Sequence, residues 1–174
     1  MSPAKDGFAP AYCAVAQTGQ AFGERADCAV KAVALACGVP YERVRTFMLA
    51  AGRKPGRRTR IDVTEAAVRA FGFELEEVKA GSFIERYPHP HHKLYNVTTH
   101  HPKRFNKVWA DGATYLFRTR DHILAVVNGE NQDWTRGRAK HVRVIYRVVL
   151  AFRPPLPRYL TLTSHNGITG EPYD

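Results

Sequence analysis

Residues 25–40, RADCAVKAVALACGVP, contain the clearest helical pattern in the chain. The apolar positions recur at the spacing of one helical face: Val30, Val33, Ala34 and Cys37. Gly38 follows them and is a typical helix stop. The pattern predicts a helix over residues 27–37, with a thiol, Cys28, on its first turn.

Cys28 has two interpretations. Free cysteine is among the most buried residue types, so Cys28 is either a small core residue or a reactive thiol. A helix N-terminus favours negative charge and lowers the pKa of a thiol, which favours reactivity at this position. Cys37 lies at the opposite end of the same helix, where a thiolate is disfavoured, and we expect Cys37 and Cys13 to be structural.

A nucleophilic cysteine also needs a base that a third group orients. His122 begins an apolar segment that suits a central strand, residues 122–128. The Asn128-Gly129 pair is a strong hairpin signal, so the returning strand would bring Asp133 back beside His122. Asp133 is the predicted orienting group, and Asn128 and Asn131 are the alternatives.

These segments resemble small phage and prophage proteins of the papain-like cysteine peptidase superfamily. Those proteins have a DC-x-V-x-A-x-A-x-A-x-G-x-x-Y helix, matched here by residues 27–41. Their next elements are a G-x-Y strand, a GH-x-hydrophobic-A strand and a short return strand bearing aspartate. The corresponding residues here are 112–115 (GATY, with two residues between Gly112 and Tyr115), 121–129 (DHILAVVNG, with Asp121 in place of the glycine) and Asp133-Trp134.

The resemblance implies an α+β, papain-like fold in which N-terminal helices pack on an antiparallel sheet. It implies a Cys28–His122–Asp133 hydrolase that cleaves a peptide, isopeptide or other amide bond of a protein or peptide-like substrate through a thioester, without a cofactor. It also implies an oxyanion hole that includes the backbone N–H of Cys28. Gln20 is the candidate for the glutamine that papain-like enzymes place before the cysteine, although neither it nor Gln17 has the usual spacing.

The 174 residues are enough for one compact domain and few for two. We expect a single domain over 1–153, with a His-rich insertion at about 88–109, and an arm or tail over 154–174. No apolar run reaches transmembrane length, and the first residues lack the layout of a secretory signal. Three cysteines do not make a disulfide framework. These features predict no membrane contact. The resemblance to phage and prophage proteins implies a location in the bacterial cytoplasm or in a virion.

Other elements follow from local patterns in the sequence. Residues 1–23 show no strong periodicity. Pro40 is expected to open a second helix that ends near Ala51, and residues 62–65 (DVTE) read as a capping box for a third. The remaining expectations are strands at 73–76, 114–119, 131–134 and 142–152, and a helical turn at 82–87.

The charge balance supports an alternative function. Lys and Arg outnumber Asp and Glu by 26 to 16, a formal net charge of +10. Such an excess favours contact with nucleic acid or another polyanion, and it concentrates in residues 53–60 and 136–141. The alternative is therefore a non-catalytic phage module of the same fold that binds nucleic acid or a partner protein through its basic surface.

Five histidines raise the question of a metal: His89, His91, His92, His100 and His101. Their spacing matches no standard zinc motif and no cysteine lies nearby, so we expect a solvated insertion and no metal site.

Overall fold

The computed structural model describes residues 8–78, 109, 111–135 and 142–151. These residues form four helices and five strands: α1 (Pro10–Ala21), α2 (Cys28–Cys37), α3 (Tyr41–Ala50), α4 (Ile61–Ala70), β1 (Phe73–Glu77), β2 (Thr114–Arg118), β3 (Ile123–Val127), β4 (Glu130–Asn131) and β5 (Val144–Leu150). The predicted α+β class is confirmed. Most of the His-rich stretch, the turn expected at 82–87, the basic run 136–141 and the C-terminal arm lie outside the described residues.

The five strands form one antiparallel sheet in the order β1-β5-β2-β3-β4. The expected strands at 73–76 and 114–119 are present as β1 and β2. The long strand expected over 142–152 is present as β5, although it spans only 144–150. β5 lies between β1 and β2, so it joins a strand of the helical half of the chain to the hairpin that carries His122.

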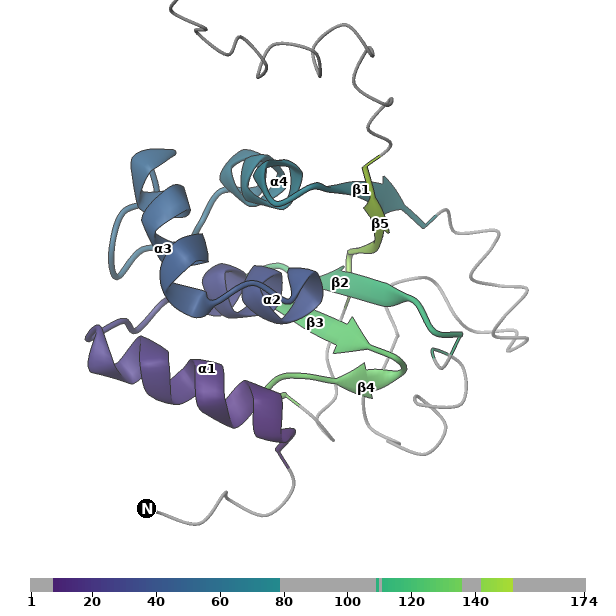
Figure 1. Ribbon diagram of the computed structural model, residues 1–174, viewed down its shortest axis with the longest axis horizontal. Helices are drawn as coiled ribbons and strands as arrows, with labels where there is room; N and C mark the ends of the chain where they lie inside the picture. The colour runs from purple at the N-terminus through teal and green to yellow at the C-terminus, as the bar shows by residue number, and fades with distance from the viewer. Residues whose placement is uncertain (1–7, 79–108, 110, 136–141, 152–174) are drawn as a thin grey trace, which may run out of the picture.

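The helices cover one face of this sheet. In Figure 1, α2 crosses in front of β2 and β3, with α1 on one side and α3 and α4 on the other. The alternation of side chains along β2 divides the core, because Leu116 faces the helices while Tyr115 and Phe117 face away. The second face has its own buried cluster: Trp109, Tyr115, Phe117, Leu124, Val126, Val142 and Ile145.

α2 is the central helix, as its sequence predicts. Its buried side chains are small or β-branched and include Val30 and Val33, both fully buried. Small residues allow a helix to approach a sheet and its neighbouring helices closely. Gly38 ends the helix with φ of 62°, a left-handed conformation that glycine adopts without strain.

The expected capping box at residues 62–65 is wrong. α4 begins at Ile61, and the residue in the capping position is Arg60, with no side-chain capping bond. Asp62 lies one position inside the helix, where its carboxylate accepts two hydrogen bonds from the Arg60 guanidinium at 3.0 and 2.8 Å. The competing arginine therefore explains why the motif does not cap.

α1 is the helix for which the sequence shows no clear periodicity. It packs against α2 and α3. Gly19 allows this approach, because a Cβ at this position would collide with the carboxylate of Asp27 and press on the hydroxyl of Tyr41. The apolar residues of α1 are mostly small and are interspersed with polar ones. This pattern suits a helix that contacts other helices on part of its surface only.

The hairpin predicted at Asn128-Gly129 is present. Both residues have positive φ, 48° and 79°, and they connect β3 to β4 in a two-residue turn. The return strand is shorter than expected, because β4 contains only Glu130 and Asn131. Asp133 therefore lies beyond the strand, in the turn that follows it.

None of the described helices is long and apolar enough to span a membrane.

Candidate active site

Cys28 is the first residue of α2 and is half-buried. It lines two adjoining cavities, of about 150 Å³ and about 270 Å³. His122 and Arg58 line both of them as well. The structure thus brings together Cys28 and His122, which are 94 residues apart in the sequence.

The backbone of His122 is held by the tight connection between β2 and β3. Thr119 accepts a hydrogen bond from the His122 N–H at 3.0 Å and donates one from its hydroxyl to the His122 carbonyl at 3.1 Å. The Thr119 N–H also donates to that carbonyl, at 2.8 Å. The imidazole therefore projects from a fixed backbone at the end of the sheet, one residue before β3 begins.

The His122 ring is oriented by Asp133. Nε2 of His122 lies 2.8 Å from Oδ2 of Asp133, and the two side chains are 11% and 6% exposed. The same carboxylate oxygen accepts a hydrogen bond from the Thr135 N–H at 3.0 Å. Because Asp133 engages Nε2, the nitrogen that remains for the thiol is Nδ1.

Trp134 packs against the His122 ring. Its ring meets the His122 ring edge to face, with centroids 5.5 Å apart, and 36% of the residue is exposed. Packing of this ring against His122 adds to the burial of the imidazole, whose side chain is 11% exposed.

The two pKa values move in the directions that a nucleophile and its base require. Burial raises the pKa of Cys28, but hydrogen bonding to His122, the charge of that ring and the Ile123 N–H lower it, and the net shift is downward. Burial lowers the pKa of His122, whereas its bonds to Asp133 and Cys28 raise it, to about 9. These directions favour a thiolate–imidazolium pair at neutral pH.

The start of α2 is fixed by Asp27. Its buried carboxylate accepts a hydrogen bond from the Tyr41 hydroxyl at 2.7 Å and pairs with Lys31 at 2.9 Å. Asp27 therefore makes no side-chain cap for α2. Its hydrogen bond with Tyr41 connects the residue before Cys28 to the first residue of α3. Asp27 and Tyr41 are also the first and last residues of the motif at 27–41.

The loop before Cys28 is anchored by a buried ion pair. Arg53 donates two hydrogen bonds to Glu24, at 2.9 and 2.8 Å, and Arg45 donates a third at 3.0 Å. The side chains of Arg53 and Glu24 are 0% and 2% exposed. Hydrogen bonding to Arg53 lowers the pKa of Glu24 to about 2, against the opposing effect of burial. Arg53, part of the basic run 53–60, is thus a structural residue.

The other predicted residues lie in varied places. Gln20 is exposed on the last turn of α1 and lines neither cavity, and Gln17 is also exposed. The structure does not bring Gln20 to the thiol. Asn131 donates a hydrogen bond to Thr135 at 3.3 Å, and Asn128 is exposed in the hairpin turn. Of the three candidates for the orienting group, Asp133 alone is found bonded to His122 within the described residues.

The remaining cysteines differ from Cys28. Cys37 is buried at the end of α2, and burial raises its pKa to about 12. Cys13 is half-buried on α1. Neither lines the cavities that Cys28 and His122 share.

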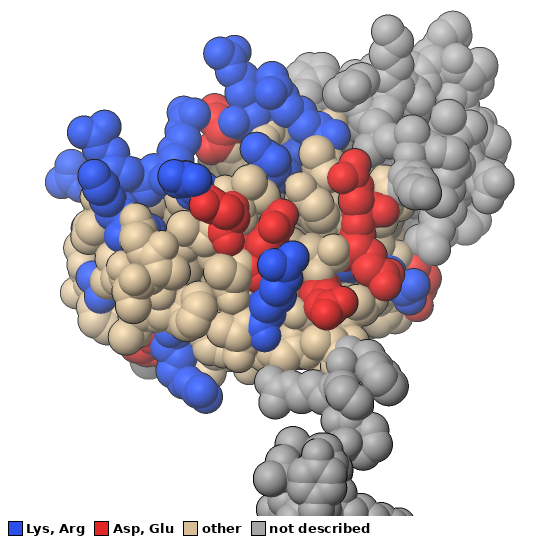
Figure 2. Space-filling view, turned by 90° about the horizontal axis from the view of Figure 1, so that it is seen from above, with Lys and Arg blue, Asp and Glu red and all other residues tan. Residues whose placement is uncertain are grey.

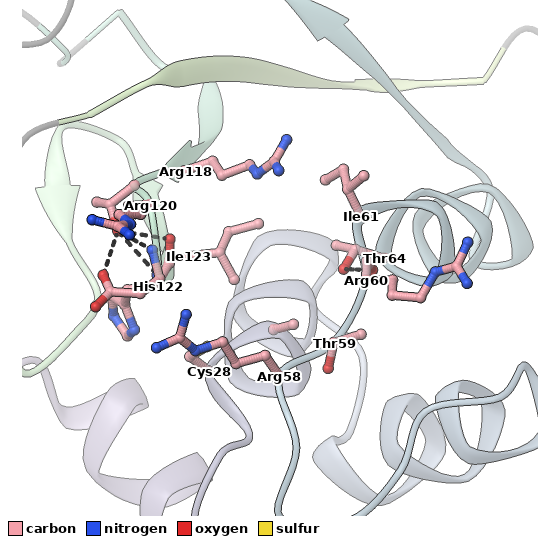
Figure 3. Close-up of a pocket in the computed structure, with 13 residues that line it drawn as sticks. Cys28, Arg58, Thr59, Arg60, Ile61, Thr64, Arg118, Arg120, His122 and Ile123 are labelled. Atoms are coloured by element: carbon pink, nitrogen blue, oxygen red, sulfur yellow. Dashed lines mark hydrogen bonds between the residues drawn. The ribbon is translucent and has the colours of Figure 1, made fainter.

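Sequence reasoning missed three side chains beside the thiol: Arg58, Arg118 and Tyr12. Tyr12 comes from α1 and lines the larger cavity with Cys28 and Asp133. Figure 3 shows Arg58 reaching over Cys28 from the loop before α4, and Arg118 extending from the end of β2. In the sequence, Arg58 is marked only by the basic character of residues 53–60. The other residues that line the cavity, on α2 and around the β2–β3 connection, are far from it in the chain.

The basic charge is unevenly distributed. In Figure 2, Lys and Arg side chains gather along one margin of the face seen from above, and Asp and Glu side chains lie over its middle. Two members of the basic run are already paired, since Arg53 binds Glu24 and Arg60 binds Asp62. The run is therefore not one uniform anion-binding surface.

Within the described ranges, no group of three or more histidine, cysteine, aspartate or glutamate side chains is arranged to hold a metal ion. The histidines at 89, 91, 92, 100 and 101 lie outside those ranges.

Comparisons of the chain with protein-family models, with curated proteins and with solved structures found no match.

Proposed function

We propose that this protein is a cysteine hydrolase of papain-like fold that cleaves an amide bond by acyl transfer. Cys28 is the nucleophile, His122 the general base and acid, and Asp133 the group that orients the imidazole. The observation that carries the proposal is the position of the His122 ring, which shares both cavities with Cys28 while Asp133 binds Nε2 at 2.8 Å.

The resting state of the site is a thiolate–imidazolium pair. The downward shift of the Cys28 pKa and the upward shift of the His122 pKa to about 9 support this state. A thiolate is the reactive form of cysteine, so no proton needs to be removed when substrate arrives.

Acylation begins when Sγ of Cys28 attacks the carbonyl carbon of the amide. The carbonyl π electrons move to oxygen, and His122 gives its proton to the departing nitrogen as the C–N bond breaks. An amine leaves and a thioester remains on Cys28. In the second step His122 removes a proton from water, the hydroxide attacks the thioester, and the C–S bond breaks to release the acid and restore the thiolate.

The negative oxygen of each tetrahedral intermediate needs hydrogen-bond donors. The backbone N–H of Cys28 is a suitable donor, because the first N–H groups of a helix have no intrahelical acceptor. In α2 the helical bonding begins at Lys31, whose N–H donates to the Asp27 carbonyl at 3.0 Å. Gln20 lines neither cavity, so it is not assigned as a second donor.

A peptide library tests the proposal. The library is incubated with the wild type, with Cys28→Ala and with His122→Gln, and new peptide ends are identified by mass spectrometry. We expect new ends with the wild type only. Ends that form equally with Cys28→Ala would mean that cleavage does not use this thiol.

A further inference from the structure

We infer that the smaller cavity beside Cys28 binds an anionic side chain of an acidic peptide substrate. The inference rests on the proposed function, because it names the substrate class of the same thiol.

The lining of this cavity is strongly basic. It contains four arginines and one acidic residue: Arg58, Arg60, Arg118, Arg120 and Asp121. Arg60 is committed to Asp62. The ion pairs found within the described part of the chain include none for Arg58, Arg118 or Arg120. Three arginines and one aspartate outside these ion pairs thus line the cavity, an excess of positive charge that an anionic ligand would balance.

The arginines come from both sides of the cavity. Figure 3 shows Arg58 entering from the loop before α4, with its guanidinium toward Cys28 and His122. Arg118 reaches from the end of β2 toward Ile61, and it is half-buried. A guanidinium presents several N–H donors in a plane and binds carboxylates and phosphates through paired hydrogen bonds. The Arg58 guanidinium can therefore pair with an anionic side chain near the thiol, and Arg118 adds positive charge at the Ile61 end of the same cavity.

Two helices also begin at this cavity. Cys28 and Ala29 contribute the start of α2, and Ile61 and Thr64 contribute the first turn of α4. The N-terminal end of a helix carries partial positive charge, so both helices add to the potential that the arginines create.

The cavity favours a peptide over a nucleic acid. Its volume of about 150 Å³ suits a single side chain, and none of the described residues that line it is Phe, Tyr or Trp. Single-stranded nucleic acid is usually held by aromatic side chains on which the bases stack. The shared chemistry is therefore an anionic group on a peptide, either a carboxylate or a phosphate.

Two alkylating reagents that differ in charge measure the preference of the cavity for an anion. Iodoacetate carries a negative charge and iodoacetamide does not, and both react with the same thiolate. The ratio of their rates at Cys28 is independent of how much thiolate is present, so it reports only the environment that the reagent enters. We expect the ratio of the iodoacetate rate to the iodoacetamide rate to be higher for Cys28 in the folded protein than for a cysteine peptide. This ratio should fall as salt is added.

Variants assign the preference to the cavity. Arg58→Gln and Arg118→Gln should each lower the ratio about fivefold, the effect of removing one nearby charge. Arg58→Lys, which keeps the charge, should retain most of it. Arg69→Gln is the matched control, because Arg69 lies on the last turn of α4 and lines neither cavity. Thermal melts establish that each variant is folded.

The outcomes separate the inference from the proposed function. A Cys28 that reacts rapidly with iodoacetamide, but with a ratio unchanged in Arg58→Gln and Arg118→Gln, overturns the inference alone. A Cys28 that reacts no faster than a cysteine peptide with either reagent overturns the proposed function.

Peptide probes then identify the anion. Peptidyl vinyl sulfones bearing glutamate, phosphoserine or glutamine next to the reactive group are compared for labelling of Cys28, with a single-stranded oligonucleotide as competitor. Faster labelling by the glutamate or the phosphoserine probe supports the inference and names the anion as carboxylate or phosphate. Equal labelling by the glutamine probe overturns it. Protection by the oligonucleotide, with no preference among the peptides, also overturns it and favours a nucleic-acid site.

Discussion

Nε2 of His122 lies 2.8 Å from Oδ2 of Asp133, and this contact leaves Nδ1 as the ring nitrogen that can interact with Cys28. The carboxylate is itself held by the Thr135 N–H, so the ring has a fixed partner on one side. Asp133 thus occupies the position of an orienting group, and Asn128 and Asn131 have other surroundings.

Replacing Asp133 by asparagine should slow alkylation of Cys28. The amide would keep the size of the side chain but lose the charge that raises the His122 pKa. A less stable imidazolium stabilises the thiolate less, which raises the Cys28 pKa. The Asp133 charge itself raises that pKa, but it is the smallest of the effects on the thiol, so its loss offsets only part of the rise. The pH–rate curve for iodoacetamide therefore moves to higher pH. We expect a shift of about one pH unit, equivalent to about 1.4 kcal/mol.

Two asparagine positions serve as controls for that shift. Asn128→Gly should leave the curve unchanged, since Asn128 is exposed with φ of 48°, a conformation that glycine adopts readily. Asn131→Ala should change stability through the lost bond to Thr135 more than it changes the curve. If Asp133→Asn matches the wild type while Asn131→Ala shifts the curve, the orienting group is wrongly assigned.

Replacing Gly19 by alanine should destabilise the protein. Helix propensity alone predicts a gain of about 1 kcal/mol for this change inside α1. The structure predicts the opposite sign, because the new Cβ would collide with the Asp27 carboxylate beside Cys28. Chemical denaturation measures the sign directly, and a stabilised Gly19→Ala protein would contradict the close approach of α1 to this loop.

Replacing Arg53 by alanine should cost about 3–5 kcal/mol, because it leaves the Glu24 carboxylate buried with only Arg45 as a partner. Arg60→Ala is the matched control. The Arg60–Asp62 pair has the same 2.8 Å contact, but its side chains are 81% and 57% exposed, and such pairs contribute about 0–1 kcal/mol. Similar losses for the two variants, measured by urea denaturation, would mean that Arg53 is not a buried anchor.

The same ion pair predicts how stability depends on pH. The pKa of Glu24 falls from an ordinary 4.5 to about 2 in the folded protein. A lowered carboxyl pKa contributes stability that is fully present above pH 4.5 and is lost as the pH falls from 4.5 through 2. Urea denaturation across this range should show the loss in the wild type and a smaller slope in Glu24→Gln.

The sequence predicted the elements that have strong local signals. The Cys28 helix, the turn at Asn128-Gly129 and the pairing of His122 with Asp133 all follow from periodicity, turn chemistry and spacing. α1 was not predicted, because only part of its surface contacts other helices and its apolar pattern is therefore weak. The capping box predicted at Asp62 is wrong because the motif does not reveal that the Asp62 carboxylate is hydrogen-bonded to Arg60.

The surroundings of the thiol depend on tertiary structure. Arg58 and Arg118 are separated by 60 residues and line the same cavity only because the loop before α4 and the end of β2 both border it. Arg53 looked like its solvated neighbours, although it is fully buried against Glu24. No local pattern distinguishes a buried arginine from an exposed one in the same basic run.

The pH dependence of Cys28 alkylation tests the central claim most directly. Iodoacetamide is applied at limiting concentration from pH 5 to pH 10, and the modified peptides of Cys28, Cys13 and Cys37 are quantified for the wild type and for His122→Gln. The account predicts that Cys28 reacts first and stays reactive below the ordinary thiol pKa of about 8.5, and that His122→Gln, with an unchanged melt, abolishes this advantage. A Cys28 that titrates like an ordinary thiol, or reacts no faster than Cys13, or is unaffected by His122→Gln, would contradict it.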